Sequence, residues 1–194
     1  MAVFDQVIQY FSAASFQPED GLFWAENRSE LNGRLLAWSR KFEKGGAAQQ
    51  RAAVLVAVLG ELGNNSFDHN LGQWADLPGC LIGIEFLKDR FRIAVADRGQ
   101  GIARSLGRVR PDIKDPFALL RMAFEETISG RSPEKRGNGL KFVRKIFLSH
   151  GGLSLICISS RARYVLGMDK EILNPLSSLQ GDVGTLTVID WSRP

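Results

Sequence analysis

The stretch from Glu61 to Asn70, which reads ELGNNSFDHN, places ionisable and hydrogen-bonding side chains at the end of an otherwise apolar segment. Glu61, Asn65 and His69 are spaced four residues apart, so on a continuous helix they share one face, with Asp68 adjacent. A carboxylate, a carboxamide and an imidazole, which can accept, donate or carry a proton, are thus aligned at the edge of a core. The solvated face of an ordinary helix has the same appearance, because charged groups are usually exposed.

Two glycine-containing segments follow at which the backbone could approach a ligand. Asp97 ends an apolar, strand-like run and opens the sequence DRGQG, whose glycines at 99 and 101 allow a sharp turn and a close approach. Farther on, GNGL at 137–140 opens an amphipathic helix. Neither segment completes GxGxxG, and the phosphate-binding loop GxxxxGK followed by Ser or Thr is absent, so the common nucleotide fingerprints do not apply.

Hydrophobic periodicity predicts the elements that position these groups. Residues 47–59 are almost entirely Ala, Val, Leu and Gln, which predicts a helix that is buried around most of its circumference and continues into the polar stretch. Residues 81–87 and 91–96 are apolar runs joined by three charged residues, as in an antiparallel hairpin. The same patterns predict a helix within 1–20, a strand at 22–24, helices at 30–42, 116–128 and 139–150, and strands at 153–159, 163–166 and 185–190.

The composition is typical of a globular protein. With 194 residues and 44% hydrophobic content, we expect one domain, 1–194, with an N-terminal extension at 1–45 and a core at 46–194. No apolar run has the length of a membrane span and the N-terminus lacks a basic region, so we expect a cytoplasmic protein. Cys80 and Cys157 have no second cysteine or histidine at ligand spacing, which argues against a zinc site or a disulfide and predicts reduced core thiols.

Positive charge is concentrated between Arg98 and Lys145, where twelve Lys and Arg stand against five Asp and Glu, although the whole chain carries only +4. A local basic field suits a polyanion, either the phosphates of a nucleotide or a nucleic-acid backbone. A merely solvated surface is the alternative explanation.

The segment at about 104–138 is predicted to form a lid. It is partly helical, with Phe117, Leu120 and Phe124 in register on the helix at 116–128. The sequence SGRSPEKRGNG that follows is rich in Gly, Ser, Pro and charge, which is typical of a mobile loop. Mobility next to a ligand suggests a lid that closes over it.

The order and the amino-acid sequences of the three polar segments resemble those in the ATP-binding domains of the GHKL superfamily. This superfamily includes DNA gyrase, Hsp-class chaperones, histidine kinases and mismatch-repair ATPases. That family has an N box of Glu or Asn, three residues and Asn, then a D-x-G-x-G box and a G-x-G-L box. The matching residues here are, in order, Glu61, Asn65, Asp97, Gly99, Gly101, Gly137, Gly139 and Leu140. The similarity continues through GLKFVRKIFLSHGG and the closing GTLTVID, over about residues 45–190.

The resemblance implies an α/β (α+β) two-layer sandwich of the Bergerat type, with a mixed, mostly antiparallel sheet and helices on one face. It also implies ATP and Mg²⁺ as ligands. Asp97 would accept a hydrogen bond from the adenine amino group, while Gly99 and Gly101 would leave room for base and sugar. Asn65 would hold Mg²⁺ through its carbonyl oxygen, because this hard cation takes few protein ligands.

The phosphate end of the implied site is the start of the helix that opens at Gly139, where exposed amides and the helix dipole would bind phosphate oxygens. The candidates there are Arg136, Gly137, Asn138, Gly139, Leu140 and Thr185. Arg131 and Lys135 share the lid with Arg136 and are further candidates to neutralise the γ-phosphate. A solvated lid charge explains any one of these three equally well.

Glu61 is the candidate catalytic residue. In family members that hydrolyse ATP or phosphorylate serine, a glutamate here orients or deprotonates the attacking hydroxyl, whereas many histidine kinases have Asn, His or Asp. The glutamate favours hydrolysis or serine phosphorylation over histidine phosphorylation. His69 and His150 are interpreted as structural, so no phosphoacceptor histidine remains and the chain is not a complete sensor kinase.

Two functional classes remain open. In the first, the chain is an enzyme in signal transduction: an ATPase, or an anti-sigma-type serine kinase that phosphorylates an unidentified partner protein. In the second, ATP orders the lid and the N-terminal segment to form a partner surface, without catalysis. A third interpretation, nucleic-acid binding by the basic segment, is less favoured and would show strong salt dependence.

Overall fold

The computed structural model describes residues 3–12, 23–41, 47–70, 72–126, 138–167, 176, 179 and 183–192. The elements are, in chain order, α1 (Val3–Ser12), β1 (Phe23–Ala25), α2 (Arg28–Lys41), α3 (Ala47–Asn70), β2 (Cys80–Phe86), β3 (Arg90–Asp97), α4 (Ile102–Gly107), α5 (Pro116–Glu125), α6 (Gly139–Ser149), β4 (Leu153–Ser159), β5 (Ala162–Leu166) and β6 (Thr185–Ser192). Each expected helix and strand is confirmed, with ends that differ by a few residues, and α4 is an addition. None of the described helices combines the length and apolarity that crossing a membrane would need.

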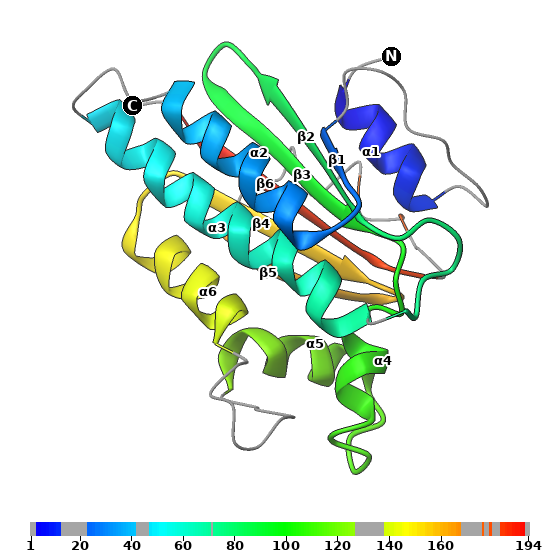
Figure 1. Cartoon of the computed structure of the whole chain (residues 1–194). Coiled ribbons are helices and arrows are strands. Elements are labelled where there is room, and N and C mark those ends of the chain that lie inside the picture. Colours follow the sequence, from blue (N-terminus) through cyan, green and yellow to red (C-terminus); the bar gives the residue numbers. More distant parts are fainter. Residues whose placement is uncertain are drawn as a thin grey trace.

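The last strand, β6, lies in the middle of the sheet rather than at its edge. The strand order is β1-β2-β3-β6-β4-β5 (Figure 1). The expected mostly antiparallel sheet is confirmed, but its mixed character is not, because all described neighbours pair antiparallel. Since β6 pairs with both β3 and β4, Thr185 lies opposite Asp97 on one side and Ser159 on the other. The ends of three distant segments therefore meet at one end of the sheet.

Both faces of the sheet are covered by helices. Successive residues of a strand point to opposite faces, and in β3 Ile93 and Val95 join the core under α2, α3, α5 and α6. Ala94 and Ala96 join a second core with α1. The expected arrangement with helices on one face is therefore corrected: α1 lies apart from the other helices, against β2 and β3 (Figure 1). A strand that is apolar on both sides needs a cover on both.

Two contacts hold α1 against the sheet. Gly83 of β2 allows a close approach, because a Cβ there would lie 2.7 Å from Val7 Cγ2. Arg98, which follows the last residue of β3, donates from Nη1 to the Tyr10 carbonyl oxygen at 2.6 Å and from Nε to Asp76 Oδ1 at 2.7 Å. The loop after β3 is thus connected to the C-terminal end of α1, where a cation is favourable.

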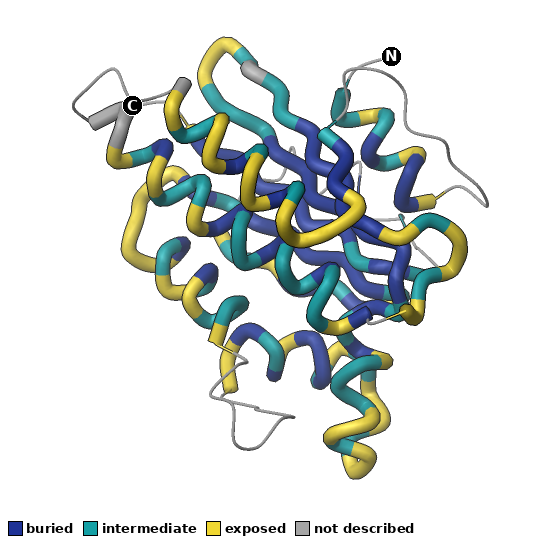
Figure 2. Tube along the Cα trace, viewed as in Figure 1, coloured by how far each residue is buried: buried dark blue, intermediate teal, exposed yellow. Residues whose placement is uncertain are grey.

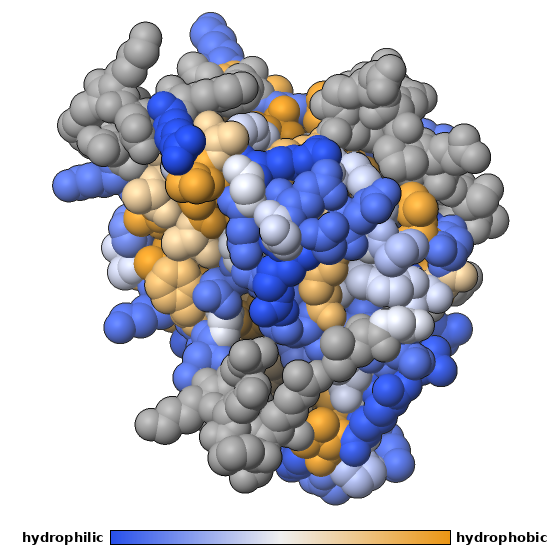
Figure 3. Space-filling view, in the orientation of Figure 1, coloured by the Kyte–Doolittle hydropathy of each residue, from blue (hydrophilic) through white to orange (hydrophobic). Residues whose placement is uncertain are grey.

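The long helix α3 is less buried than its composition predicts. Buried, intermediate and exposed positions alternate along this part of the chain (Figure 2). Ala53 and Ala57 are among the exposed residues of α3. Figure 3 shows hydrophobic residues on the left of this face, over α6 and the N-terminal half of α3. The rest of the face is mostly hydrophilic. On another side of α3, Gly63 allows α2 to pack closely, since a Cβ on this glycine would lie 2.7 Å from Leu31 Cδ2.

Helix α5 lies between the main core and α4, and this arrangement changes the predicted buried face. Leu120 and Phe124 are buried in the main core, and the Phe124 ring stacks on Tyr164 at 4.2 Å between centroids. Leu119 instead joins a small core with α4. Phe117, expected in register with the buried residues, is 49% exposed because the first turn of α5 extends beyond both cores.

Candidate functional site

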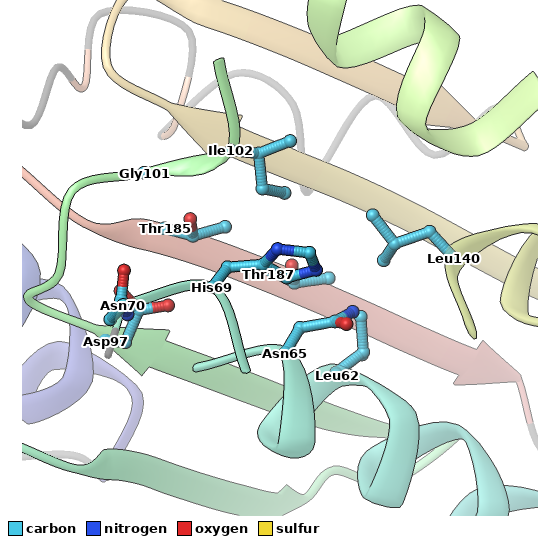
Figure 4. A pocket seen from close by; sticks show the side chains of 10 residues that line it. All are labelled: Leu62, Asn65, His69, Asn70, Asp97, Gly101, Ile102, Leu140, Thr185 and Thr187. Carbon is cyan, nitrogen blue, oxygen red and sulfur yellow. The ribbon is translucent and has the colours of Figure 1, made fainter. Parts of the chain in front are cut away.

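A pocket opens where β3 ends and β6 begins (Figure 4). Its lining includes five of the predicted site residues, from four segments of the chain: Asn65, Asp97 and Gly101, Leu140, and Thr185. In Figure 4, Asp97 lies at one end and Leu140 at the other, with Asn65 between them. The fold therefore brings these distant residues together.

Asp97 is the last residue of β3 and is only 6% exposed. Its Oδ1 accepts hydrogen bonds from Asn70 Nδ2 at 3.1 Å and from the Gly99 backbone N–H at 2.9 Å, and its Oδ2 accepts from the Ser66 hydroxyl at 3.3 Å. The Thr185 backbone also hydrogen-bonds this carboxylate. Burial raises the pKa of Asp97 from 3.8 to about 6, and the hydrogen bonds oppose that rise. At pH 7 the group is mostly ionised and accepts hydrogen bonds.

Contacts within the chain already require the two glycines after Asp97. Gly101 has a φ of +79°, and a Cβ there would lie 2.8 Å from Ser159 Oγ and 3.0 Å from the Gly184 carbonyl oxygen. A Cβ on Gly99 would lie 1.9 to 2.0 Å from the amide atoms of Asn70. Each glycine thus admits a neighbour from this chain, which is a different reason from the room for base and sugar that the resemblance implies.

The polar face predicted for α3 is divided between three surroundings. The helix is continuous to its last residue, and Asn65 and His69 both line the pocket. Glu61 is not a lining residue; its carboxylate lies at the start of α6, where a Cβ on Gly139 would be 2.3 Å from Oε2. Asp68 accepts a hydrogen bond from an arginine of α2. Of these four side chains, the Asn65 carboxamide and the His69 imidazole reach the pocket.

The start of α6 lies beside the pocket. Asn138 is the N-cap residue, but its side chain accepts no hydrogen bond from a backbone N–H of the first turn; its Oδ1 instead accepts from the side-chain Nζ of Lys141 at 3.2 Å. Leu140 is the residue of this box that lines the pocket. Four predicted residues lie outside the described part of the chain: Arg131, Lys135, Arg136 and Gly137.

The Asn65 amide has unused hydrogen-bonding capacity at the pocket. Its Nδ2 is buried and has no partner among the described residues. Its Oδ1 is a hard oxygen donor of the kind that Mg²⁺ takes. No three His, Cys, Asp or Glu side chains of the described segments gather as a metal site. A cation held by Asn65 would therefore need water or ligand oxygens for most of its coordination.

The pocket also includes residues that the sequence analysis did not select. Thr187 follows Thr185 by two positions on β6, and such residues share a face of a strand, so this signal was present in the sequence. Leu62 and Ile102 add apolar wall. Asn70 lines the pocket from the end of α3, and its importance depends on contacts that no local pattern reveals.

The histidines and cysteines have different roles. His150 Nδ1 lies 3.1 Å from the Ile146 carbonyl oxygen at the end of α6, as expected of a hydrogen-bonded helix-end residue. His69, also interpreted as structural, instead presents its ring to the pocket (Figure 4). Cys80 and Cys157 are buried and free, as predicted, and burial raises the pKa of both thiols to about 12.

Neither a scan against protein-family models nor a search of curated proteins finds a match to this chain.

Proposed function

We propose that this chain binds ATP and Mg²⁺ in the pocket, as a histidine-kinase-like ATPase domain. On this proposal it either hydrolyses ATP or transfers the γ-phosphoryl group to a serine of a partner protein, as anti-sigma kinases do. The observation that carries the proposal is convergence, because Asn65, Asp97, Gly101 and Leu140 come from three separate sequence boxes and line one pocket. A pocket with a few convergent polar groups and a perturbed pKa is where a ligand is expected.

The Asp97 end suits an adenine base. An ionised carboxylate only accepts hydrogen bonds, so it would take one from the 6-amino group of adenine. Leu62, Ile102 and Leu140 contribute apolar surface to the same pocket, as recognition of a flat ring requires. The buried Asp97 carboxylate would then confer base selectivity, since a ligand with an acceptor in place of the amino group would face another acceptor there.

The other end suits phosphates. No side-chain cap from Asn138 occupies the first turn of α6, so the backbone N–H groups there and the positive end of the helix dipole favour an anion. Asn65 Nδ2, which has no partner among the described residues, could donate to a phosphate oxygen, and its Oδ1 could hold Mg²⁺. Mg²⁺ bound there would neutralise phosphate charge and polarise the γ-phosphoryl group.

Glu61 decides between catalysis and simple binding. It lies one helical turn before Asn65 and against the start of α6, hence at the phosphate end, where a general base or orienting group would be needed. However, Glu61 is not a lining residue of the pocket. This second observation favours the alternative function, a non-catalytic switch in which bound ATP orders neighbouring segments into a partner surface.

Calorimetry of ATP binding with and without Mg²⁺, followed by phosphate release in the same preparation, tests the proposal. We expect wild type to bind ATP in a Mg²⁺-dependent manner. Glu61→Ala should bind within about threefold of wild type and lose at least about 100-fold in phosphate release. Asp68→Ala is the matched control: it removes a carboxylate of α3 that pairs with Arg28 of α2 and does not line the pocket, so both measurements should be unchanged.

Each outcome has a distinct meaning. Binding without phosphate release in wild type contradicts the ATPase. Incubation with γ-labelled ATP and a protein extract then separates a serine kinase, which transfers the label, from the switch, which does not. Absence of ATP binding by the wild-type chain would overturn the proposal as a whole.

A further inference from the structure

Asn70, the last residue of α3, uses both Nδ2 and Oδ1 of its amide in buried hydrogen bonds. It is only 3% exposed. Its Nδ2 donates to the Ser66 carbonyl oxygen at 2.7 Å and to Asp97 Oδ1 at 3.1 Å, and its Oδ1 accepts from the Gln100 backbone N–H at 3.0 Å. The first of these bonds stays within the helix. The other two leave it and connect the end of α3 to the loop after β3.

A role in ending the helix accounts for only one of these three bonds. An asparagine at a helix end commonly bonds local backbone groups, as Asn70 does with Ser66. The bonds to Asp97 and Gln100 instead connect two elements of different regions of the chain. Asn70 therefore determines the position of the loop relative to the helix.

Gly99 shows how closely the two elements fit. A Cβ at position 99 would lie 1.9 to 2.0 Å from Cγ, Nδ2 and Oδ1 of Asn70, so the amide packs directly on the glycine backbone. Gly99 is not among the glycines with positive φ, so its backbone conformation alone would accept alanine. The contact with Asn70 is the reason for a glycine at this position.

We propose that Asn70 is a positioning residue for base recognition: it holds the Asp97 carboxylate and the turn at Gly99 and Gln100 in the arrangement that receives the 6-amino group of a purine. This inference depends on the proposed function, and it adds a residue that lies outside the three sequence boxes. Asn70 acts through Asp97, since one of its hydrogens is already committed to the carboxylate. Without Asn70, Asp97 Oδ1 keeps the Gly99 N–H but loses its side-chain donor.

Comparison of two nucleotides tests this role in the full chain. Inosine triphosphate carries an oxygen where ATP carries the 6-amino group, so it binds without that donor. We expect Asn70→Ala to lower ATP affinity about 10-fold, the effect of one hydrogen bond to a charged group, and to change inosine triphosphate affinity by less than about twofold. The measured preference for ATP should therefore fall about 10-fold.

Asn64→Ala is the matched control, because Asn64 has the same side chain on the same helix and does not line the pocket. It should leave both affinities unchanged. Equal losses for the two nucleotides in Asn70→Ala would mean general damage to the pocket and would overturn the inference while the proposed function stands. If wild type binds no ATP, the proposed function fails, and the inference fails with it.

A double-mutant cycle in urea tests the underlying contact without any nucleotide. Gly99→Ala should lower the unfolding midpoint clearly in wild type, because the new methyl collides with the Asn70 amide. In an Asn70→Ala background the same change should cost less than half as much, because the collision is gone. Additive shifts would show that Asn70 and Gly99 are not coupled, and would overturn the inference whatever the nucleotide results.

Discussion

The two ends of the pocket differ in how completely the chain satisfies their polar groups. At the Asp97 end, the buried carboxylate accepts hydrogen bonds from Asn70, Gly99 and Ser66, and both polar atoms of the Asn70 amide have partners. At the other end, Asn65 Nδ2 is buried without a partner among the described residues. Both asparagines belong to α3, five positions apart, yet only one is saturated.

The difference shows which part of the pocket is preorganised. A buried polar group without a partner destabilises the folded state by about 1 to 3 kcal/mol. A ligand that accepts a hydrogen bond from Asn65 Nδ2 can remove this destabilisation. Asp97, in contrast, is held in place before any ligand arrives, at the cost of burying a charge that raises its pKa to about 6. We interpret the first end as a rigid recognition element and the second as the end that a ligand completes.

Asp97→Asn should have the largest effect on the preorganised end. An asparagine can place Oδ1 toward the Gly99 and Asn70 donors and Nδ2 toward the Ser66 hydroxyl, so the surroundings accept it. The adenine amino group would then meet a donor. We expect ATP affinity measured by calorimetry to fall at least about 100-fold, while the protein stays folded by circular dichroism. Retained ATP affinity would contradict the assignment of this end to the base.

The pH dependence of stability should identify the same buried carboxylate. Because the folded-state pKa of Asp97, about 6, lies above the ordinary 3.8, the folded protein keeps a proton that the unfolded chain releases between these values. Its contribution is therefore complete below about pH 4 and is lost as the pH rises through 6. The free energy of unfolding of wild type minus that of Asp97→Asn should fall by about 2 kcal/mol between pH 4 and 7, and a difference that does not change with pH would contradict this expectation.

Two glycine substitutions compare the rigidity of the two ends. Gly101→Ala combines a φ of +79° with collisions at Ser159 Oγ and the Gly184 carbonyl oxygen, so we expect a loss of about 2 kcal/mol in the free energy of unfolding. Gly139→Ala meets only the carboxylate end of Glu61, which can rotate away, and should change stability by less than about 0.5 kcal/mol. Equal losses of unfolding free energy for the two variants in urea denaturation would contradict the proposed difference in rigidity between the two ends.

The smallest expected effect is that of Asn65→Ala on stability. The substitution removes a buried nitrogen that has no partner, which is favourable, and also removes packed side-chain atoms, which is unfavourable, so the free energy of unfolding should change by less than about 0.5 kcal/mol or rise slightly. Asn70→Ala breaks three buried hydrogen bonds and should lower it by about 2 kcal/mol. Thermal unfolding of the two variants side by side measures the difference, and a larger loss for Asn65→Ala would reverse our comparison of the two ends.

The positions of helices and strands follow from local sequence patterns, because periodicity and turn residues act over a few neighbours. The central helix, the hairpin that ends at Asp97, and the helix that begins at Gly139 are all predicted within a few residues. Five of the ten residues that line the pocket were among the predicted site residues, and Leu140 and Thr185 were named only because of the family resemblance: Asn65, Asp97, Gly101, Leu140 and Thr185. Polar residues at the ends of apolar elements indicate a site even before the arrangement is known.

Long-range packing decided the rest. No local signal places β6 between β3 and β4, or α1 on the second face of the sheet, because each depends on which apolar surfaces remain uncovered after the other elements pack. Tertiary contacts also separate Asn70, which is bonded to the loop after β3, from Asn65, which is not. The sequence determines that α3 carries both carboxamides, and only the fold determines which of them finds partners, since hydrogen bonding depends on atoms that distant segments bring within about 3 Å.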